Sequence, residues 1–245
     1  MAELTLVWEI RRNGRRGDAP SILPLCMEED LPHGILRVSC LRDFEPQARE
    51  FFAAFGKDPF TDKALRALGE RLAPYFAARG YTPEQQGALR YYIAYRAECG
   101  EPPLPLPETD AAILLSNETD LLSFRNRTSF SLPLLIRRDR AHDIPFAAAV
   151  KDGEILSICA VNDPEEDDAV ELTVQTAPAA RGQGYAKAVC RAACWEMQSR
   201  GYAVLYCCSR YNRPSAAIAE ALGFRKLGRF YAAAGFFTNH LIRAL

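Results

Sequence analysis

The sequence has few of the residues from which metal centres and nucleophilic pairs are built. Its three histidines, His33, His142 and His240, are scattered along the chain. They show neither the spacing of zinc ligands nor a pairing with a nucleophilic cysteine. The eight cysteines include no CxxC pair and no spacing typical of a disulfide framework. Cys190 and Cys194 share one face of a predicted helix, where two small apolar core residues are a better interpretation than metal ligands. We therefore expect no metal cofactor.

The sequence also lacks a large net charge of either sign and a long apolar run. Its 30 Lys and Arg residues are balanced by 31 Asp and Glu residues, which argues against nucleic acid or an acidic membrane surface as a partner. No stretch is long enough to span a bilayer, and residues 1–10 lack the basic-then-apolar order of a signal peptide. We expect a cytoplasmic globular protein that binds neither nucleic acid nor membrane.

Proline gathers at one place, where residues 101–108 contain four prolines in eight positions. Such a segment cannot continue a helix and favours extended backbone. It predicts a boundary between a smaller domain, residues 1–105, and a second domain, residues 106–245.

The first domain is predicted to be mostly helical. Alternating apolar residues indicate a strand over 4–10 and a second over 36–40. A helical period follows over 44–55 and again over 61–72, where Pro74 ends or kinks the helix. Thr82-Pro-Glu-Gln is a good helix start with a capping box, and it predicts a third helix towards Gly100.

Strands and helices alternate in the second domain, which predicts an α/β domain with a mixed sheet. A hairpin turn is expected at Asp152-Gly153. The predicted strands are 111–115, 146–150, 155–161, 170–176, 203–208, 224–231 and 236–244, and the predicted helices are 117–128, 184–200 and 215–222.

One segment carries definite chemistry. The strand that contains Val174 breaks at Pro178, and the chain resumes as Arg181-Gly-x-Gly184-x-Ala186 at the start of a predicted helix. Glycines allow a ligand to approach the backbone closely, and a helix start offers unpaired N–H groups and partial positive charge, which favours a phosphate or diphosphate. An ordinary strand-to-helix turn and a dinucleotide site are the alternatives. A dinucleotide site needs a third glycine and an acidic residue at the end of the next strand, and neither is present.

This segment and a second one together resemble the GNAT superfamily of acetyl-CoA-dependent N-acetyltransferases. The second segment is Asn212-Arg-Pro-Ser215, followed by Gly223-Phe224. The similarity covers roughly residues 110–245. It implies a GNAT-like mixed, mostly antiparallel sheet flanked by helices, with acetyl-CoA as co-substrate and direct attack by an amine on the acetyl group. A catalytically weak or inactive CoA-binding sensor module is the alternative function.

The resemblance also implies roles for individual residues. Backbone groups of Val174 and Thr176 are expected to bond the pantetheine arm where the strand separates from its neighbour. The N–H of Val174, or that of a neighbouring residue, is expected to polarise the thioester carbonyl. Amides from Arg181 to Ala186 are expected to hold the diphosphate. Asn212 and Ser215 are expected to contact the pantetheine or the phosphates, while capping of the next helix is a competing role for Asn212. The predicted cofactor-binding residues are Val174, Gln175, Thr176, Arg181, Gly182, Gln183, Gly184, Tyr185, Ala186, Asn212 and Ser215.

Two positions depart from the family pattern. Ala179 stands where Gln or Arg is usual, and Ala219 stands where many members have the Tyr that protonates the departing thiolate. The alternative proton donors are Tyr185, Tyr211, Tyr231 and solvent, and none of them is preferred.

Glu171 is the predicted general base, because it precedes the separating part of the strand and partial burial would raise its pKa. A solvent-facing or Arg-paired Glu171, with a water chain as base, is the alternative. The acceptor is expected to be a small-molecule or peptide amine, and the first domain is expected to set the specificity for it. The protein is expected to be either a monomer or a homodimer.

Overall fold

The computed structural model describes residues 5–11, 24–78, 89–97, 109–116, 146–162 and 169–233. The chain forms two compact units. One consists of Met1–Ala94, Cys208–Tyr211 and Lys226–Leu245, and the other of Tyr95–Cys207 and Asn212–Arg225. The predicted domain boundary falls in residues 98–108, outside the described residues, and it stays a prediction.

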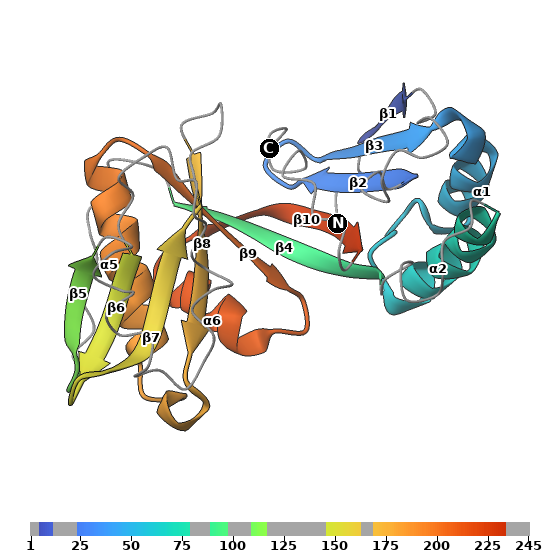
Figure 1. The fold of residues 1–245 in the computed structure, drawn as a ribbon. Coiled ribbons are helices and arrows are strands. Elements are labelled where there is room, and N and C mark those ends of the chain that lie inside the picture. Colours follow the sequence, from blue (N-terminus) through green and yellow to red (C-terminus); the bar gives the residue numbers. More distant parts are fainter. Residues whose placement is uncertain are drawn as a thin grey trace. The chain divides into compact units, whose positions relative to one another are not determined.

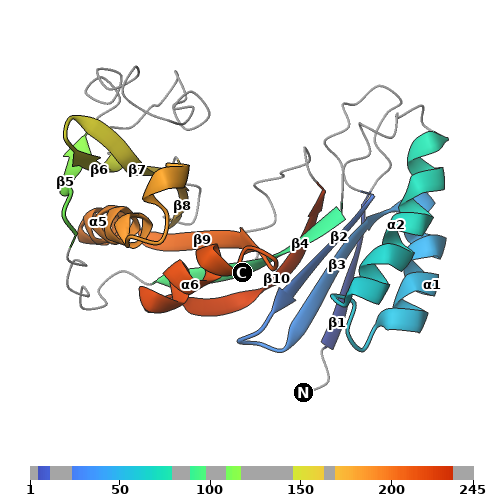
Figure 2. The same ribbon diagram turned by 90° about the horizontal axis from the view of Figure 1, so that it is seen from below.

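The first unit contains a sheet with two helices on one face (Figures 1 and 2). The strand order is β1-β3-β2-β10, in which β1 and β3 are parallel and the other pairs antiparallel. Large apolar side chains of the helices, Phe51 and Phe52 among them, are buried. The elements are β1 (Thr5–Arg11), β2 (Leu25–Asp30), β3 (Ile35–Leu41), η1 (Arg42–Phe44), α1 (Glu45–Phe55), α2 (Asp62–Ala77) and β10 (Arg225–Ala233).

The prediction of a mostly helical N-terminal region is wrong. The predicted strands over 4–10 and 36–40 are present as β1 and β3, but β2 was missed because its sequence, Leu-Cys-Met-Glu-Glu-Asp, contains three acidic residues with low strand propensity. The third helix is also wrong from residue 89 onwards, since Leu89–Ala97 is strand β4. Tyr and Ile favour a strand, and Tyr92 stacks on Phe230 of β10 with ring centroids 5.5 Å apart. Residues 79–88, with the predicted helix start, lie outside the described residues.

The two other helices of the first unit were predicted in the right places. Helix α2 begins after Thr61, whose hydroxyl accepts a hydrogen bond from the Ala64 N–H. It continues through Pro74 to Ala77, so Pro74 does not end it. Because Pro74 lies within the last turn, the helix loses one N–H and still closes with a bond from the Ala78 N–H to the Pro74 carbonyl.

The second unit is the α/β domain with a mixed sheet that the alternation predicts, and the sheet is mostly antiparallel. Its strand order is β9-β8-β7-β6-β5, and β8 and β9 are its parallel pair. Helix α5 packs against β5 to β8 (Figure 1). The predicted helix 117–128 and strand 236–244 lie outside the described residues. The elements are β5 (Ala112–Ser116), β6 (Phe146–Lys151), β7 (Glu154–Val161), β8 (Ala169–Thr176), η3 (Pro178–Ala180), α5 (Tyr185–Ser199), β9 (Ala203–Ser209) and α6 (Arg213–Ala221).

Cysteines contribute to the core of the second unit. Cys159, Cys190 and Cys194 are buried and form no disulfide, and burial raises the pKa of the Cys159 thiol.

Within the described ranges, no group of three or more His, Cys, Asp or Glu side chains is arranged to hold a metal ion. Over the same ranges, no helix has the length and apolar character needed to cross a bilayer.

Candidate functional site

Strands β8 and β9 separate part-way along their length. Their parallel pairing covers Ala169–Glu171 and Ala203–Leu205, although β8 continues to Thr176 and β9 to Ser209. On its other edge β8 stays paired with β7 as far as Thr176, without a register shift. Beyond Glu171 and Leu205, the described part of the chain therefore gives β8 a strand partner on one edge only.

The hydrogen-bond pattern decides which backbone groups face the unpaired edge. The Asn162 N–H donates to the Glu171 carbonyl, and the Ala177 N–H donates to the Leu156 carbonyl. In an antiparallel ladder the bonded positions alternate, so the odd-numbered residues between these two points bond β7. The N–H and C=O groups of Leu172, Val174 and Thr176 consequently point to the side where β9 has separated. This direction is the one expected for Val174 and Thr176.

Two glycines open the start of α5. Gly182 and Gly184 have φ values of +78° and +87°, which side chains disfavour, and a Cβ built on either would meet no protein atom within 4 Å. Gly184 is the N-cap and provides no side-chain hydrogen bond, and the first intrahelical bond runs from the Ala188 N–H to the Gly184 carbonyl. The N–H groups of residues 185–187 therefore have no acceptor within the helix. Free N–H groups beside open space suit an anion such as a diphosphate.

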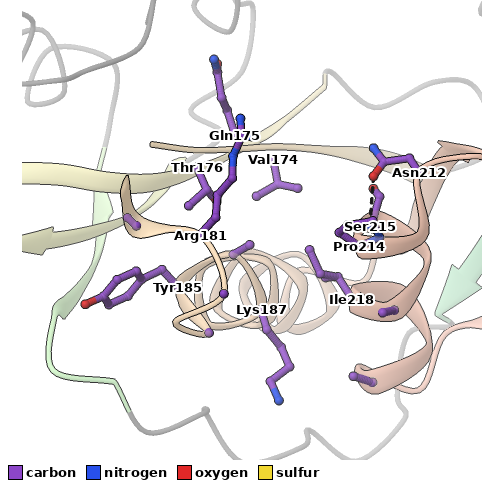
Figure 3. A pocket seen from close by; sticks show the side chains of 16 residues that line it. Val174, Gln175, Thr176, Arg181, Tyr185, Lys187, Asn212, Pro214, Ser215 and Ile218 are labelled. Atoms are coloured by element: carbon purple, nitrogen blue, oxygen red, sulfur yellow. Dashed lines mark hydrogen bonds between the residues drawn. The ribbon is translucent and has the colours of Figure 1, made fainter. Parts of the chain in front are cut away.

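A pocket of about 780 Å³ joins these features (Figure 3). Gln183 is the predicted cofactor-binding residue that does not line it, because its side-chain amide donates to the Ala179 carbonyl at 3.1 Å. The predicted residues that line the pocket are Val174, Gln175, Thr176, Arg181, Gly182, Gly184, Tyr185, Ala186, Asn212 and Ser215.

Sequence reasoning missed several lining residues on the two helices. Lys187 lies in the first turn of α5, where it adds a cation to Arg181. Pro214, Ala217, Ile218 and Ala221 lie on α6. Their spacing of three to four residues marks one helix face, and this period was a signal available in the sequence.

Asn212 and Ser215 both line the pocket, and each also makes a hydrogen bond that supports the fold. The Asn212 side-chain oxygen accepts a hydrogen bond from the Ser215 N–H at 3.2 Å and caps α6 (Figure 3), so Asn212 both caps the helix and lines the pocket. The Ser215 hydroxyl is 2.7 Å from the hydroxyl of Tyr206 on β9. Tyr206 is buried, and its ring meets Phe224 edge to face.

The hydroxyl of Tyr185 is directed away from α6. Its ring extends away from Asn212 and Ser215 (Figure 3), and the hydroxyl donates to the Asp110 carboxylate. Lys151 bonds the other oxygen of Asp110 at 2.5 Å. These contacts, with Lys151 contributing most, hold the pKa of Asp110 below its ordinary value, and the bond to Asp110 raises the pKa of Tyr185. Tyr185 is therefore a poor proton donor to the pocket.

The other two tyrosines considered as proton donors are engaged in the first unit. The Tyr211 hydroxyl donates to Asp62, and the Tyr231 hydroxyl donates to the Pro59 carbonyl. Ala219, at the position where the family often has Tyr, is completely buried. None of the three candidate hydroxyls is thus directed into the pocket.

Glu171 lies at the last paired position of β8, opposite Leu205. Its side chain is half-buried, and it is not among the lining residues. Because no bulge intervenes on β8, Glu171 and Val174 point to opposite faces of the sheet. A role for Glu171 as general base stays a prediction.

A family model matches one segment of the chain. Residues 147–232 match the GNAT acetyltransferase family. Among solved structures, the chain resembles an acetyltransferase from the GNAT family of Colwellia psychrerythraea (15% identity, 64% of this chain and 60% of that chain, TM-score 0.44). It also resembles a GCN5-related N-acetyltransferase of Sphaerobacter thermophilus (17% identity, 67% of this chain and 56% of that chain, TM-score 0.45).

These structural similarities are weak. The chain spans less than two thirds of the length of either protein, and both TM-scores lie below 0.5. No curated protein matches the chain in sequence. The segment match includes most of β6, all of β7 to β9 with α5 and α6, and most of β10. The match to the GNAT acetyltransferase family therefore covers residues 147–232 of this chain.

Proposed function

We propose that this protein is an N-acetyltransferase that transfers the acetyl group of acetyl-CoA to an amine. One observation carries the proposal: the unpaired edge of β8 at Val174 and Thr176 and the glycine-opened start of α5 line the same pocket. Backbone groups on a strand edge bond an extended amide chain, and free N–H groups at a helix start bond a diphosphate. Coenzyme A contains an amide-bearing arm and a diphosphate in one molecule.

The donors in the pocket suit these two parts of the substrate. The N–H groups of residues 185–187 and the charges of Arg181 and Lys187 would hold the diphosphate. The N–H and C=O groups of Val174 and Thr176 would bond the pantetheine amides, as an added strand does. Asn212 lines the opposite wall from α6 and would contact the same arm.

The reaction we propose is direct attack of a neutral amine on the thioester carbon. The carbon–nitrogen bond forms, the carbon–sulfur bond breaks, and the sulfur leaves with the electron pair. The Val174 N–H would donate to the carbonyl oxygen as negative charge develops on it. Glu171 would accept the amine proton, through a water molecule because its side chain does not line the pocket. The acceptor is proposed to be a small-molecule or peptide amine.

Two measurements on the intact protein test this function. Titration calorimetry with coenzyme A should give saturable binding at one site. Incubation with acetyl-CoA and a panel of polyamines, amino acids, aminoglycosides and peptides should release free thiol only when a suitable amine is present. Absence of coenzyme A binding would exclude the transferase. Hydrolysis that no amine accelerates would exclude the amine acceptor.

A sensor that binds acetyl-CoA without turning it over is the second candidate. Two observations favour it: Ala219 presents no hydroxyl, and Glu171 is not among the pocket-lining residues. A sensor predicts tight coenzyme A binding with no thiol release across the whole amine panel, whereas the transferase predicts release with at least one amine.

A further inference from the structure

We propose that Asp110 positions the diphosphate-binding end of the pocket by anchoring Tyr185, the first residue of α5. The proposal rests on the proposed function, because it assigns a role in the binding of coenzyme A. Asp110 lies just before β5, 75 residues from Tyr185 in the sequence, and it is not among the pocket-lining residues. It is therefore a positioning residue, which acts through Tyr185.

The start of α5 has few bonds of its own that fix its conformation. Gly182 and Gly184 lack the side chains that restrict a backbone, and Gly184 makes no side-chain hydrogen bond to the helix that it caps. The N–H groups of residues 185–187 have no acceptor within the helix. A ligand that binds these N–H groups has to order them first, unless other contacts already fix the start of the helix.

Tyr185 makes such a contact. Its N–H is the first of the free groups at the helix start, its ring is buried, and its hydroxyl donates to the Asp110 carboxylate. In the described part of the chain, residues 181–187 make one other side-chain hydrogen bond, from Gln183 to the Ala179 carbonyl four residues earlier. Tyr185 is thus the residue whose side chain bonds the glycine loop to a distant segment of the second unit.

The Asp110 carboxylate is itself held in place by Lys151. The Lys151 ammonium bonds Oδ2 of Asp110 at 2.5 Å, while the Tyr185 hydroxyl donates to Oδ1. Each carboxylate oxygen therefore has its own donor, and charge-assisted bonds of this kind are short and strong. Lys151 is the last residue of β6, and β6 pairs with β5 along the whole of β5. The carboxylate consequently joins strands β5 and β6 to the start of α5.

The exposure of this anchor separates binding from stability. The side chains of Lys151 and Asp110 are 41% and 60% exposed, and exposed ion pairs contribute little to the free energy of unfolding. When Tyr185 loses its hydroxyl, water can reach the Asp110 oxygen, so no buried polar atom is left without a partner. Loss of the bond should therefore affect the order of the free N–H groups more than it affects folding.

The charge of Asp110 alone predicts the opposite effect on binding. A carboxylate and a diphosphate are both negative, and like charges repel. Replacement of Asp110 by Ala would, by charge alone, strengthen the binding of an anionic ligand. If Asp110 acts by anchoring Tyr185, the same replacement weakens that binding. The sign of the change therefore distinguishes the two effects.

Calorimetry with three probes tests the anchor: coenzyme A, ADP, which has the diphosphate without the arm, and pantetheine, which has the arm without the diphosphate. Tyr185→Phe and Asp110→Ala should each raise the Kd of coenzyme A and of ADP about five- to tenfold, because the ligand then has to order the helix start. The Kd of pantetheine should stay within about twofold. The double variant should bind no more weakly than either single variant, since both changes remove the same bond.

Tyr75→Phe is the matched control. Tyr75 on α2 is also buried and donates to an aspartate, Asp43, at 2.9 Å, but it does not line the pocket. Thermal unfolding of both Phe variants measures any loss of stability, and only Tyr185→Phe should change the Kd of ADP. In turnover, Tyr185→Phe should raise KM for acetyl-CoA and leave kcat within about twofold. Asp110→Ala changes an exposed side chain and serves as the independent variant if Tyr185→Phe does not fold.

The outcomes separate this proposal from the proposed function. Unchanged or tighter binding of coenzyme A and ADP by Tyr185→Phe and Asp110→Ala would overturn the anchor and leave the transferase standing. An equal loss of pantetheine binding would also overturn the anchor, because the effect would then be a general structural one. No coenzyme A binding by the wild-type protein would overturn both proposals. A selective loss of affinity for coenzyme A and ADP, absent from Tyr75→Phe, would support the anchor.

Discussion

Glu171 on β8 pairs with Leu205 on β9 at the last point where the two strands are bonded to each other. From this pair onwards, the backbone of Val174 and Thr176 faces the separated side. The glycine loop follows only a few residues later along the chain. Both halves of the site are therefore built by one continuous segment, β8 and the start of α5.

Gly184 should be required for coenzyme A binding for a reason separate from stability. Gly184→Asp places a side chain and a negative charge at a position with φ +87° that lines the pocket. We expect at least a hundredfold loss of coenzyme A affinity, or about 3 kcal/mol. Gly201→Asp is the matched control, because Gly201 has φ +88° and equally open surroundings but lies beyond the C-terminal end of α5, outside the pocket. Calorimetry and thermal unfolding of both variants separate backbone strain from binding. Equal affinity in the two variants would contradict the site.

Asn212 should contribute to both folding and binding. Asn212→Ala removes the cap of α6 and should lower the free energy of unfolding by about 1 kcal/mol. Thr61→Ala removes the equivalent bond to Ala64 at the start of α2 and should cost a similar amount. Urea unfolding measures the loss in the free energy of unfolding in both variants. Only Asn212→Ala should also weaken coenzyme A binding, and a variant with unchanged binding would restrict Asn212 to capping.

The buried carboxyl of Glu28 should make stability depend on pH. Burial on β2 raises its pKa from 4.5 to about 8, although Arg37 partly opposes the shift. The folded state therefore holds a proton that the unfolded state has lost between these two pH values. The free energy of unfolding should fall as pH rises from about 5 to 8, by at most about 1.4 kcal/mol per pH unit, and level off above.

Glu28→Gln should flatten this dependence, as urea unfolding at pH 5.5, 6.5 and 7.5 would measure. The exposed Glu154 provides the control, since Glu154→Gln should keep the wild-type slope. An equal slope in Glu28→Gln and the wild-type protein would show that another group titrates.

Gly228 should be essential to the sheet of the first unit. It pairs with Asp30 across β10 and β2, and a Cβ there would lie 1.6 Å from the Glu29 carbonyl oxygen. Gly228→Ala should destabilise the protein by about 3 kcal/mol or more, because the clash is with backbone that has to move. Gly34→Ala, at φ +64° in open space, should cost only about 1–2 kcal/mol. Comparable thermal unfolding midpoints for the two variants would rule out this close strand contact.

The sequence predicted the second unit better than the first for a physical reason. In the second unit, local signals agree with the packing. The glycines at 182 and 184 take positive φ, and the apolar runs of β7, β8 and β9 are buried. In the first unit, tertiary pairing overrides local preference. β2 buries three acidic residues, and Arg229 stabilises one of them through two bonds of 2.6 Å to Glu29.

The same difference between local signals and tertiary contacts applies to the candidate site. Glycine spacing and the Asn212–Ser215 segment could be recognised in the sequence because each acts within a few residues of the chain. The glycines act through their positive φ, and Asn212 through a bond from the Ser215 N–H to its side-chain oxygen. The contact between Tyr206 and Ser215 joins β9 to α6, and no local period reveals it. The engagement of Tyr185 by Asp110, which lies 75 residues away in the sequence, was equally hidden, so the choice among tyrosines stayed open until the structure placed their hydroxyls.

Titration of the intact protein with coenzyme A tests the central claim most directly. The claim predicts saturable heat for one site per chain, with an affinity that desulfo-coenzyme A largely retains and that Gly184→Asp abolishes. Absence of binding heat at millimolar coenzyme A, or the same affinity in Gly184→Asp as in the wild-type protein, would contradict it.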